Sequence, residues 1–420
     1  MPPSFHRINI AQFLSALADN ALLIVAIALL QRTGQPASWV PLLRFFFIIA
    51  YVALAPFVGA LADAVPKARL MAWMNGLKWF GAAALALGLH PLLAFAVIGT
   101  GAAAYAPAKY GLVTELVEAR RLVAANAWIE VTVVAAVLLG TAGGGYLVSA
   151  GFESTAFARA IGAWAGEHGW VSVRLAPALL VVLLLYGASS AINWRIRCVA
   201  PRIVALRLPV LGREFVAAHW MLWRDRDGGR LSLAVTSLFW GASAVMQFAV
   251  LRWAVERLGL SLAAAAYLQA VVAVGLVAGA AIAGRHVALV NAPRMLSAGV
   301  ALGALVAIGP WVGDAWSAAA LLLAIGTLGG VLMVPMNAML QHRGCVLLTP
   351  GRSIAVQGFN ENASVLAMLA VYAWTVSLEV PITPTMAVFG FGLAATMALL
   401  RWRFRRLVNE RAQRHAQAVS

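Results

Sequence analysis

The sequence predicts an all-α polytopic membrane protein, with twelve transmembrane helices in two pseudo-symmetric six-helix halves. Hydrophobic residues make up 63% of the chain and charged residues only 11%, and the mean hydropathy is +0.87. A soluble protein needs far more charge to cover its surface. The number of helices and their pairing into halves follow from long apolar runs and from an internal repeat.

Apolar runs of about 20 residues recur along the chain, and each is long enough to cross a hydrocarbon core of about 30 Å. Twelve such runs are separated by short polar breaks, with centres near residues 20, 50, 80, 100, 136, 185, 242, 272, 302, 328, 363 and 390. The segment before the first run has one Arg and no small-residue cleavage site, which predicts an uncleaved N-terminus.

The distribution of basic residues predicts the orientation in the membrane. With an even number of helices both termini share one side, and all but six of the 31 Lys and Arg fall on that side. The exceptions are Arg32, Arg44, Arg159, Arg174, Arg252 and Arg257. Because cytoplasmic loops are enriched in Lys and Arg, we expect both termini in the cytoplasm. The formal charge of +16 then reflects topology and attraction to anionic lipids, and it requires no nucleic-acid partner.

Two stretches of the chain repeat one pattern, which is a Gly-Thr pair, a Pro, a basic turn and an amide four residues before a glutamate. The two copies are Gly99, Thr100, Pro107, Asn126 and Glu130, and Gly326, Thr327, Pro335, Gln357 and Glu361. A spacing of four places each amide and its glutamate on one helical face. The repeat predicts two parallel halves related by an axis along the membrane normal.

The predicted parts are an N-terminal half (8–196), a cytoplasmic Arg-rich linker (197–230), a C-terminal half (231–402) and a basic cytoplasmic tail (403–420).

Asp19 lies near the middle of the first apolar run. A carboxylate at that depth costs roughly 3 kcal/mol, and such groups usually face a water-filled cavity or a partner. Asn20 makes the position more polar still, which favours a cavity that a substrate passes through. The alternative is a satisfied structural carboxylate inside a helix bundle.

Cysteine and histidine patterns predict neither a metal nor a cofactor. Cys198 and Cys345 both fall on the predicted cytoplasmic side, without neighbours at metal-ligand spacing. The seven His form no His-Glu-x-x-His pattern, and the chain has no phosphate-binding P-loop. A membrane enzyme acting on lipid would need a His-Asp acyltransferase-like pair or a metal cluster. Since neither is found, we do not expect an enzyme.

The segment Gly59-Ala-Leu-Ala-Asp63-Ala-Val-Pro66-Lys67-Ala-Arg69 resembles the cytoplasmic motif of the major facilitator superfamily, which is Gly-x-Leu-Ala-Asp followed by basic residues. The resemblance implies the major facilitator fold. It also implies a conformational latch, in which Asp63 pairs with basic groups or with a helix N-terminus. Pro66 departs from the motif, which usually has a second Gly there. A solvated charged turn is the alternative interpretation of this segment.

Further stretches resemble the bacterial lysophospholipid transporter family. They are residues 11–16, 19–23, 55–63, 101–111, 236–242, 354–357 and 361–362, of which Pro-Ala-Lys-Tyr-Gly (107–111) and Ser-Leu-Phe-Trp-Gly (237–241) are the most specific. Members of that family flip lysophosphatidylethanolamine and lysophosphatidylglycerol to the cytoplasmic leaflet of the bacterial inner membrane. An acyltransferase/acyl-carrier-protein synthetase re-acylates them there. The resemblance implies the same function by alternating access for this chain, with that enzyme as a possible partner and a monomer as the default state.

A lysolipid needs a polar site for its head group and an apolar path for its single acyl chain. We expect Asp19 to attract an ethanolamine ammonium group, and amide side chains to bond glycerol and phosphate oxygens. The amides are Asn20, Asn126, Gln357, Asn360 and Asn362. Trp240, Met246 and Phe248 either line the path of the acyl chain or face the surrounding lipid.

The charged candidates each have two interpretations. Glu130 and Glu361 either bind substrate or are structural acids at helix starts. Lys109 either binds a phosphate or belongs to the general excess of Lys and Arg on the cytoplasmic side. Members of the family carry an Arg where this chain has Gln247, so either Arg252, nearer the periplasmic end, takes its place or the preferred lysolipid differs.

Residues 152–170 predict a short amphipathic helix on the periplasmic surface, because apolar residues fall at helical spacing with charges off the stripe. The stripe is Phe152, Ala156, Phe157, Ala160, Ile161, Trp164 and Ala165. This helix either guides lysolipid from the outer leaflet or is an idle loop.

The alternative function is a proton-coupled drug or small-solute antiporter of the same superfamily, with Asp19 as the proton site. Proton-coupled efflux would distinguish it. Sequence leaves open the head-group and acyl preference, any ion coupling, and a stable complex with the acyltransferase.

Overall fold

The computed structural model describes residues 1–36, 39–170, 172–197 and 208–419. Within these ranges the chain is helical throughout, with turns and bends but no strand, as the apolar runs predict. The part of the predicted linker at 198–207, including Cys198, lies outside the described residues. From residue 208 onward that linker forms the helix α10 (Leu208–Arg224), a turn, and the first two residues of the helix that begins at Gly229.

Nine helical segments of the described chain are long and apolar enough to cross a membrane. The helices concerned are α1 (Pro3–Arg32), α5 (Pro91–Leu116), α6 (Leu122–Leu147), α9 (Ala176–Trp194), α11 (Gly229–Glu256), α12 (Leu262–His286), α13 (Leu296–Ile308), α14 (Ala315–Leu347) and α16 (Ile382–Val419). In α12 the apolar segment begins at Tyr267, and in α16 it ends at Leu407. Short 3-10 turns adjoin some of them: η1 (Ala119–Arg121), η2 (Leu289–Met295) and η3 (Gly309–Trp311).

Three further predicted spans are less regular. The helices α2 (Trp39–Ala53) and α3 (Ala55–Ala64) meet at a bend of 64° and together form a tenth apolar span. The helices α4 (Lys67–Ala86) and α15 (Pro350–Ser377) are long enough to cross a membrane but more polar. The count is therefore consistent with twelve membrane helices, and the protein is a multi-pass membrane protein.

The described structure divides into two compact units. Unit 1 consists of Met1–Glu118, Thr132–Trp220 and Gly344–Phe359, and unit 2 of Ala119–Val131, Met221–Arg343 and Asn360–Ser420. Unit 1 is mostly the N-terminal part of the chain but includes Gly344–Phe359. Unit 2 is mostly the C-terminal part but includes Ala119–Val131. The helices α6 and α15, which carry the two copies of the amide-glutamate repeat, both divide between the units.

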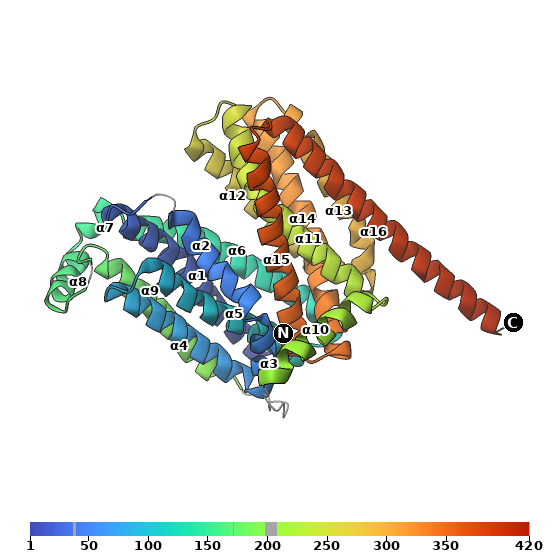
Figure 1. Cartoon of the computed structure of the whole chain (residues 1–420), viewed down its shortest axis with the longest axis horizontal. Coiled ribbons are helices and arrows are strands. Elements are labelled where there is room, and N and C mark those ends of the chain that lie inside the picture. The colour runs from blue at the N-terminus through green and yellow to red at the C-terminus, as the bar shows by residue number, and fades with distance from the viewer. Residues whose placement is uncertain (37–38, 171, 198–207, 420) are drawn as a thin grey trace. The chain divides into compact units, whose positions relative to one another are not determined.

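The core of unit 1 lies among α1, α2, α4, α5 and α9. In Figure 1, α4 packs between α5 and α9, α1 packs on α9, and α2 packs on α5. Leu22, Leu85, Ile98 and Tyr186 are among its fully buried side chains. A Cβ on Gly99 would lie 2.5 Å from a backbone carbonyl of α2, so this glycine permits the close approach of two membrane helices.

The core of unit 2 lies among α11, α12, α13, α14 and α16, around the fully buried Trp253. Glycines bring α12 against α14, because a Cβ on Gly275 or Gly326 would collide with the backbone of the other helix. The same applies to Gly303 of α13, which lies against α16. Small residues at helix contacts are the usual device where lipid removes the hydrophobic drive for association.

Residues 150–167 form two short helices, α7 (Ala150–Glu153) and α8 (Ala156–Glu167), rather than one. The Thr155 hydroxyl accepts a hydrogen bond from the N–H of Ala158 and so caps α8. The small residues of α8 face the protein, whereas Phe157 and Trp164 are 48% and 44% exposed. The predicted apolar stripe is therefore turned largely outward.

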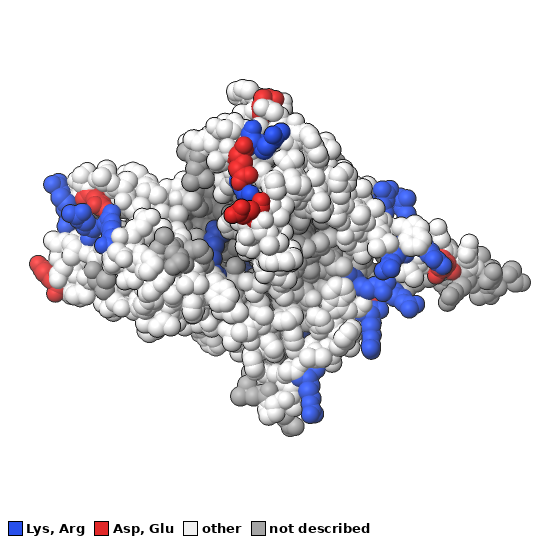
Figure 2. Space-filling model, turned by 45° about the horizontal axis from the view of Figure 1, so that its top comes forward, with Lys and Arg blue, Asp and Glu red and all other residues white. Residues whose placement is uncertain are grey.

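Charged side chains are sparse on the surface. Figure 2 shows Lys and Arg around the C-terminal part of α16 and over the α7–α8 segment, a mixed group of acidic and basic side chains near the top, and further basic side chains at the lower edge. Broad uncharged areas lie between these groups on the visible face. Such areas suit contact with lipid tails.

Candidate functional site

Asp19 belongs to a connected polar cluster inside unit 1. Its two carboxylate oxygens lie 3.0 and 2.7 Å from Lys78 Nζ, and the Tyr186 hydroxyl donates a hydrogen bond of 2.7 Å to Oδ1. The three residues come from α1, α4 and α9, which pack together. Asp19 is thus held by two donors and is not an isolated carboxylate.

Lys78 is the more deeply buried member of this ion pair. Its side chain is 3% exposed, whereas that of Asp19 is 21% exposed. Its Nζ also lies 3.1 Å from Ser15 Oγ and within 6 Å of the ring centroids of Tyr105 and Tyr186, at 5.6 and 5.8 Å. An ammonium buried without a counter-ion is strongly destabilising. The two charges therefore depend on each other, and the pair as a whole is neutral.

A chain of hydrogen bonds extends the cluster across unit 1. The Ser15 hydroxyl donates to Asn75 Oδ1 at 2.8 Å, Asn75 Nδ2 donates to Ser189 Oγ at 2.7 Å, and the Ser189 hydroxyl donates to the Ala11 carbonyl at 2.6 Å. Ser15, Asn75 and Ser189 are buried. Mutual hydrogen bonding is what allows such groups inside an apolar bundle.

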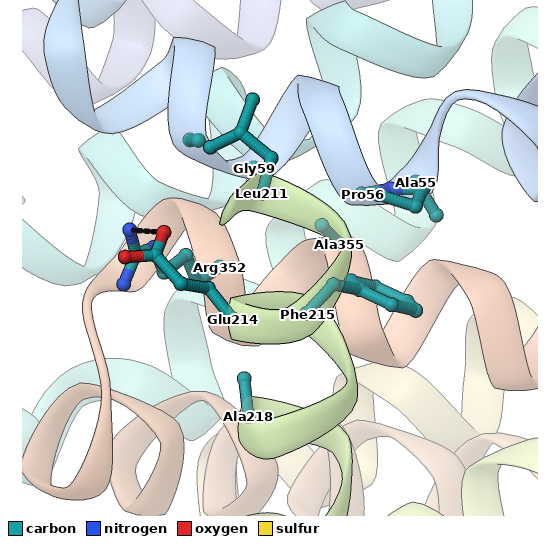
Figure 3. Close-up of a pocket in the computed structure, with 10 residues that line it drawn as sticks. Ala55, Pro56, Gly59, Leu211, Glu214, Phe215, Ala218, Arg352 and Ala355 are labelled. Atoms are coloured by element: carbon teal, nitrogen blue, oxygen red, sulfur yellow. Dashed lines mark hydrogen bonds and ion pairs between the residues drawn. The ribbon is translucent and has the colours of Figure 1, made fainter. Parts of the chain in front are cut away.

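The latch motif lies in unit 1, where α3 meets the start of α15 (Figure 3). The Asp63 carboxylate accepts hydrogen bonds from the N–H groups of Gly351 and Arg352, at 2.9 and 3.2 Å. These are first-turn donors of α15 that have no partner within the helix. The negative charge of Asp63 also complements the positive end of the helix dipole.

The basic residues of the latch motif have different partners. Lys67 Nζ lies 2.7 Å from Glu115 Oε1 and 3.7 Å from Asp63 Oδ1, so it connects α4 to α5 and to α3. The Arg69 guanidinium instead stacks on the ring of Trp194, at 4.1 Å from the centroid. It also donates a hydrogen bond of 3.3 Å to the Trp194 carbonyl. Arg69 therefore braces α4 against the end of α9.

The helix α10 covers the same junction. Figure 3 shows a small pocket between α3, α10 and α15, with the Glu214–Arg352 ion pair at one side and Phe215 at the other. The Arg352 Nη2 to Glu214 Oε2 distance is 2.6 Å. Phe215 also packs edge-on against Phe359, with ring centroids 5.4 Å apart. The linker helix is therefore tied to the first turns of α15.

An ionic contact also follows α10 in unit 2. Arg343 of α14 pairs with Asp225 at 2.6 Å and with Asp227 at 3.2 Å. Burial opposes ionisation of Asp225, but hydrogen bonds from Arg343 and from the N–H of Gly229 outweigh it, and the pKa of this carboxyl is lowered. Asp225 thereby anchors the turn that precedes α11.

The amides of the repeat lie at different places. In unit 2 Asn126 exchanges two hydrogen bonds of 2.9 Å with Gln341 of α14, and both side chains are buried. Gln357 is buried in the unit 1 segment of α15. Asn20 bonds the Ala16 carbonyl of its own helix at 2.8 Å.

The remaining acidic and amide candidates vary in burial. Glu130 is buried near the start of α6, and Glu361 and Asn362 are half-buried on α15. Asn360 accepts a hydrogen bond of 3.2 Å from the indole of Trp223.

The candidates on α11 do not gather into one pocket that the structure describes. Trp240 is half-buried and Gln247 is exposed, and the carbonyl of Gln247 accepts a hydrogen bond from Gln269. Arg252 Nε pairs with Glu256 one turn along, at 2.5 Å. In unit 1, Lys109 is buried, with its ammonium 4.0 Å from the ring centroid of Tyr110.

Sequence reasoning missed Lys78 as a site residue and assigned it to cytoplasmic positive charge. A signal was present, because Lys78 lies close to the centre of the span predicted near residue 80, which is too deep for topology alone. Glu115, Glu214 and Gln341 were also missed. No spacing rule connects them to partners so far away in sequence. Among the described residues no cluster of His, Cys, Asp and Glu is suited to a metal ion.

The sequence comparison assigns the family. A sequence model of the Major Facilitator Superfamily matches residues 8–367. The chain belongs to the Major Facilitator Superfamily of membrane transporters.

Within that superfamily the chain is similar to particular transporters. It is 39% identical over 405 residues to the lysophospholipid transporter LplT of Escherichia coli O1:K1, covering 94% of this chain and 95% of the relative. The same values hold for LplT of Escherichia coli O45:K1 (strain S88).

Solved structures support the fold. A structure of the Escherichia coli fucose:proton symporter FucP superposes with a TM-score of 0.73 at 14% identity, covering 95% of this chain and 98% of that one. The human organic anion transporter MFSD10 gives 0.70 at 15% identity, covering 96% and 100%. At such identities the likeness concerns the fold alone.

Proposed function

We propose that this protein moves lysophospholipids, namely lysophosphatidylethanolamine and lysophosphatidylglycerol, to the cytoplasmic leaflet by alternating access. The observation that carries the proposal is the 39% identity to proteins named lysophospholipid transporter, which extends over 94% of the chain. The similarity also covers 95% of the relatives, so it extends over nearly the whole of both chains. A drug or small-solute antiporter is the alternative, and these relatives do not favour it.

The head-group site of this proposal centres on Asp19. A carboxylate that is partly exposed, beside hydroxyl groups and an ammonium, offers both signs of charge to a zwitterionic head group. The amides Asn20, Asn126, Gln357, Asn360 and Asn362 are proposed to bond glycerol and phosphate oxygens. The other proposed members of the set are Lys109, Gln247 and Arg252, and the acids Glu130 and Glu361. Trp240 is proposed for the path of the acyl chain.

The latch motif is proposed to stabilise one state of the transport cycle. Gly59, Asp63, Lys67 and Arg69 are its members, and the hydrogen bonds from the start of α15 to Asp63 support the proposal. The two repeat-related halves, residues 8–196 and 231–402, are proposed as the parts that move. The segment 197–230 is their linker and 403–420 a basic tail.

The cellular setting is proposed on the same grounds. The protein resides in a bacterial inner membrane with both termini in the cytoplasm, as the Lys and Arg distribution favours. It acts as a monomer among membrane lipids and delivers its substrate to an acyltransferase/acyl-carrier-protein synthetase.

A liposome assay tests the function. Purified protein is reconstituted with fluorescent lysophosphatidylethanolamine, and protein-dependent protection of the label from an external quencher is measured, with diacyl lipid as the control. We expect movement selective for lysolipid, and its loss in Asp19→Ala, because that variant leaves Lys78 buried without a counter-ion and removes the head-group carboxylate.

Two results would contradict the proposal. Folded wild-type protein that moves no lysolipid, or moves diacyl lipid equally well, excludes a lysolipid-selective transporter. Efflux of a small solute driven by a proton gradient, without lysolipid movement, would establish the antiporter instead.

A further inference from the structure

We infer that Lys78 binds the phosphate of the transported lysolipid and that Asp19 occupies its ammonium group when no substrate is bound. This inference rests on the proposed lysolipid transport and deepens it. It assigns the phosphate to a residue of unit 1 rather than to Gln247 or Arg252 of α11.

The charges of Asp19 and Lys78 suit a zwitterionic head group. Asp19 and Lys78 form a neutral pair, with Nζ within 3.0 Å of both carboxylate oxygens. A neutral pair has little long-range attraction for an ammonium group alone. It does offer two complementary charges to a zwitterion, since an incoming phosphate replaces the carboxylate at Lys78 while an incoming ammonium replaces Lys78 at Asp19.

The two lysolipids have one charged group in common, the phosphate. Lysophosphatidylethanolamine carries an ammonium and a phosphate, whereas lysophosphatidylglycerol carries the phosphate alone. A site that serves both must therefore recognise the phosphate, which requires a cation. Asp19 by itself repels that group.

Other basic residues considered for the phosphate also have acidic partners. On α11 the position of Gln247 is neutral, and Arg252 is already paired with Glu256. Lys67 is bound to Glu115 in the latch motif. Lys78 is the one of these three cations whose partner, Asp19, is the acid proposed for the ammonium group. Asp19 is 21% exposed, which is comparable with Glu115 at 18% and less than Glu256 at 43%. A substrate can therefore reach the pair from the Asp19 side.

Local geometry supports the exchange. Lysine is a compact charge on a flexible four-carbon stem, so Nζ can turn from one acceptor to another. The hydroxyls of Ser15 and Tyr186 stand beside the pair, at 3.1 Å from Nζ and 2.7 Å from Asp19 Oδ1. Ser15 accepts from Nζ and gives its own proton to Asn75, so it positions Lys78. The Tyr186 hydroxyl, which donates to Asp19, can turn to a phosphate oxygen once the substrate ammonium group occupies Asp19.

The test compares four variants in liposomes with both lysolipids as separate probes. They are Lys78→Met, Lys78→Arg, Asp19→Asn and the double variant Asp19→Asn/Lys78→Met. Thr100→Val is the matched control, because the Thr100 hydroxyl bonds the Ala96 carbonyl of its own helix and takes no part in the Asp19 cluster. Thermal unfolding in detergent establishes that each variant is folded.

The double variant is decisive, because it removes both buried charges together. A purely structural ion pair can be replaced by neutral groups at little cost, whereas removal of one partner is strongly destabilising. We expect the double variant to be folded but to transport both lysolipids about tenfold or more slowly than wild type, as loss of a charge-assisted contact predicts. Lys78→Arg should keep part of the rate, and Asp19→Asn should impair lysophosphatidylethanolamine more than lysophosphatidylglycerol.

Recovery of wild-type rates in the double variant would overturn the inference and leave the pair a structural one. Wild-type transport of lysophosphatidylglycerol by folded Lys78→Met would overturn it as well. Absence of lysolipid movement in wild type and in Thr100→Val is a different result, because it overturns the proposed function and the inference with it.

Discussion

Gly59 and Gly351 determine how closely α3 approaches the start of α15. A Cβ on Gly59 would lie 2.7 Å from the Ala355 Cβ and 3.0 Å from the Gly351 carbonyl, and a Cβ on Gly351 would lie 2.5 Å from the Gly59 carbonyl. Only glycine allows this approach without movement of one helix. The hydrogen bonds from α15 to Asp63 depend on the same distance.

The substitution Gly59→Ala should separate α3 from α15. Overpacking of this kind costs about 1–3 kcal/mol, which lowers the melting temperature in detergent. Gly76→Ala is the matched control, because a Cβ on Gly76 meets nothing within 4 Å and Ala favours helix. Equal melting temperatures for the two variants would show that the close approach is not present in the folded protein.

The sequence identifies Asp19 as an unusual residue but does not identify Lys78 as its partner. The depth of Asp19 in an apolar run correctly marks it as a group that needs a partner. The partner is 59 positions away along the chain, on a helix whose register against α1 no periodicity specifies. The side chain was therefore interpreted as topology, although burial and pairing are its main features.

Among the helices, α10 is the least expected. The charge count predicts only an Arg-rich linker, yet Leu211, Ala218 and Leu222 are buried. Hydrophobic residues at helical spacing in the linker were available as a signal. The docking of α10 on α15 was not, because it depends on the Glu214–Arg352 pair and on aromatic packing.

A double-mutant cycle with Glu214→Gln and Arg352→Gln measures this docking. Both side chains are partly exposed, so we expect a coupling free energy of about 0.3–1 kcal/mol, reduced at high salt. The readout is the melting temperature of the two single variants and of the double variant. Strictly additive effects at low salt would exclude a direct interaction between the two side chains.

The α7–α8 segment illustrates the limit of a hydrophobic stripe. Sequence predicts an amphipathic helix across residues 152–170, and α8 does form there. Its protein-facing residues, however, are the small Ala158, Gly162 and Ala165. Small residues occupy the protein side because they allow close packing, which leaves the larger Phe157 and Trp164 outward, as an interfacial helix requires.

For the molecule as a whole, the distribution of Lys and Arg predicts the side of the membrane on which each loop lies. The proposed orientation places the turn between α7 and α8 in the periplasm and the segment between α12 and α13 in the cytoplasm. Ser154 is exposed in the first and Val290 is 84% exposed in the second. Both positions suit a test of topology.

Thiol labelling of intact cells checks the orientation. In a background with Cys198→Ser and Cys345→Ser, an impermeant maleimide should label Ser154→Cys at once. It should label Val290→Cys only after permeabilisation, because the membrane shields cytoplasmic thiols. The reverse pattern would invert the proposed topology and place both termini outside.

The membrane location, the helices and the family resemblance could all be predicted from the amino-acid sequence. The composition and length of apolar runs are local properties, and a helix that crosses a bilayer requires them. The position of Asp19 within an apolar run marked it as unusual, and the resemblance of residues 59–69 to a family motif marked Asp63. Their partners became known only from the folded chain: Lys78 and Tyr186 for the first, and the start of α15 for the second. A pairing between distant segments depends on helix register and on close contacts at glycines such as Gly59, which no local pattern encodes.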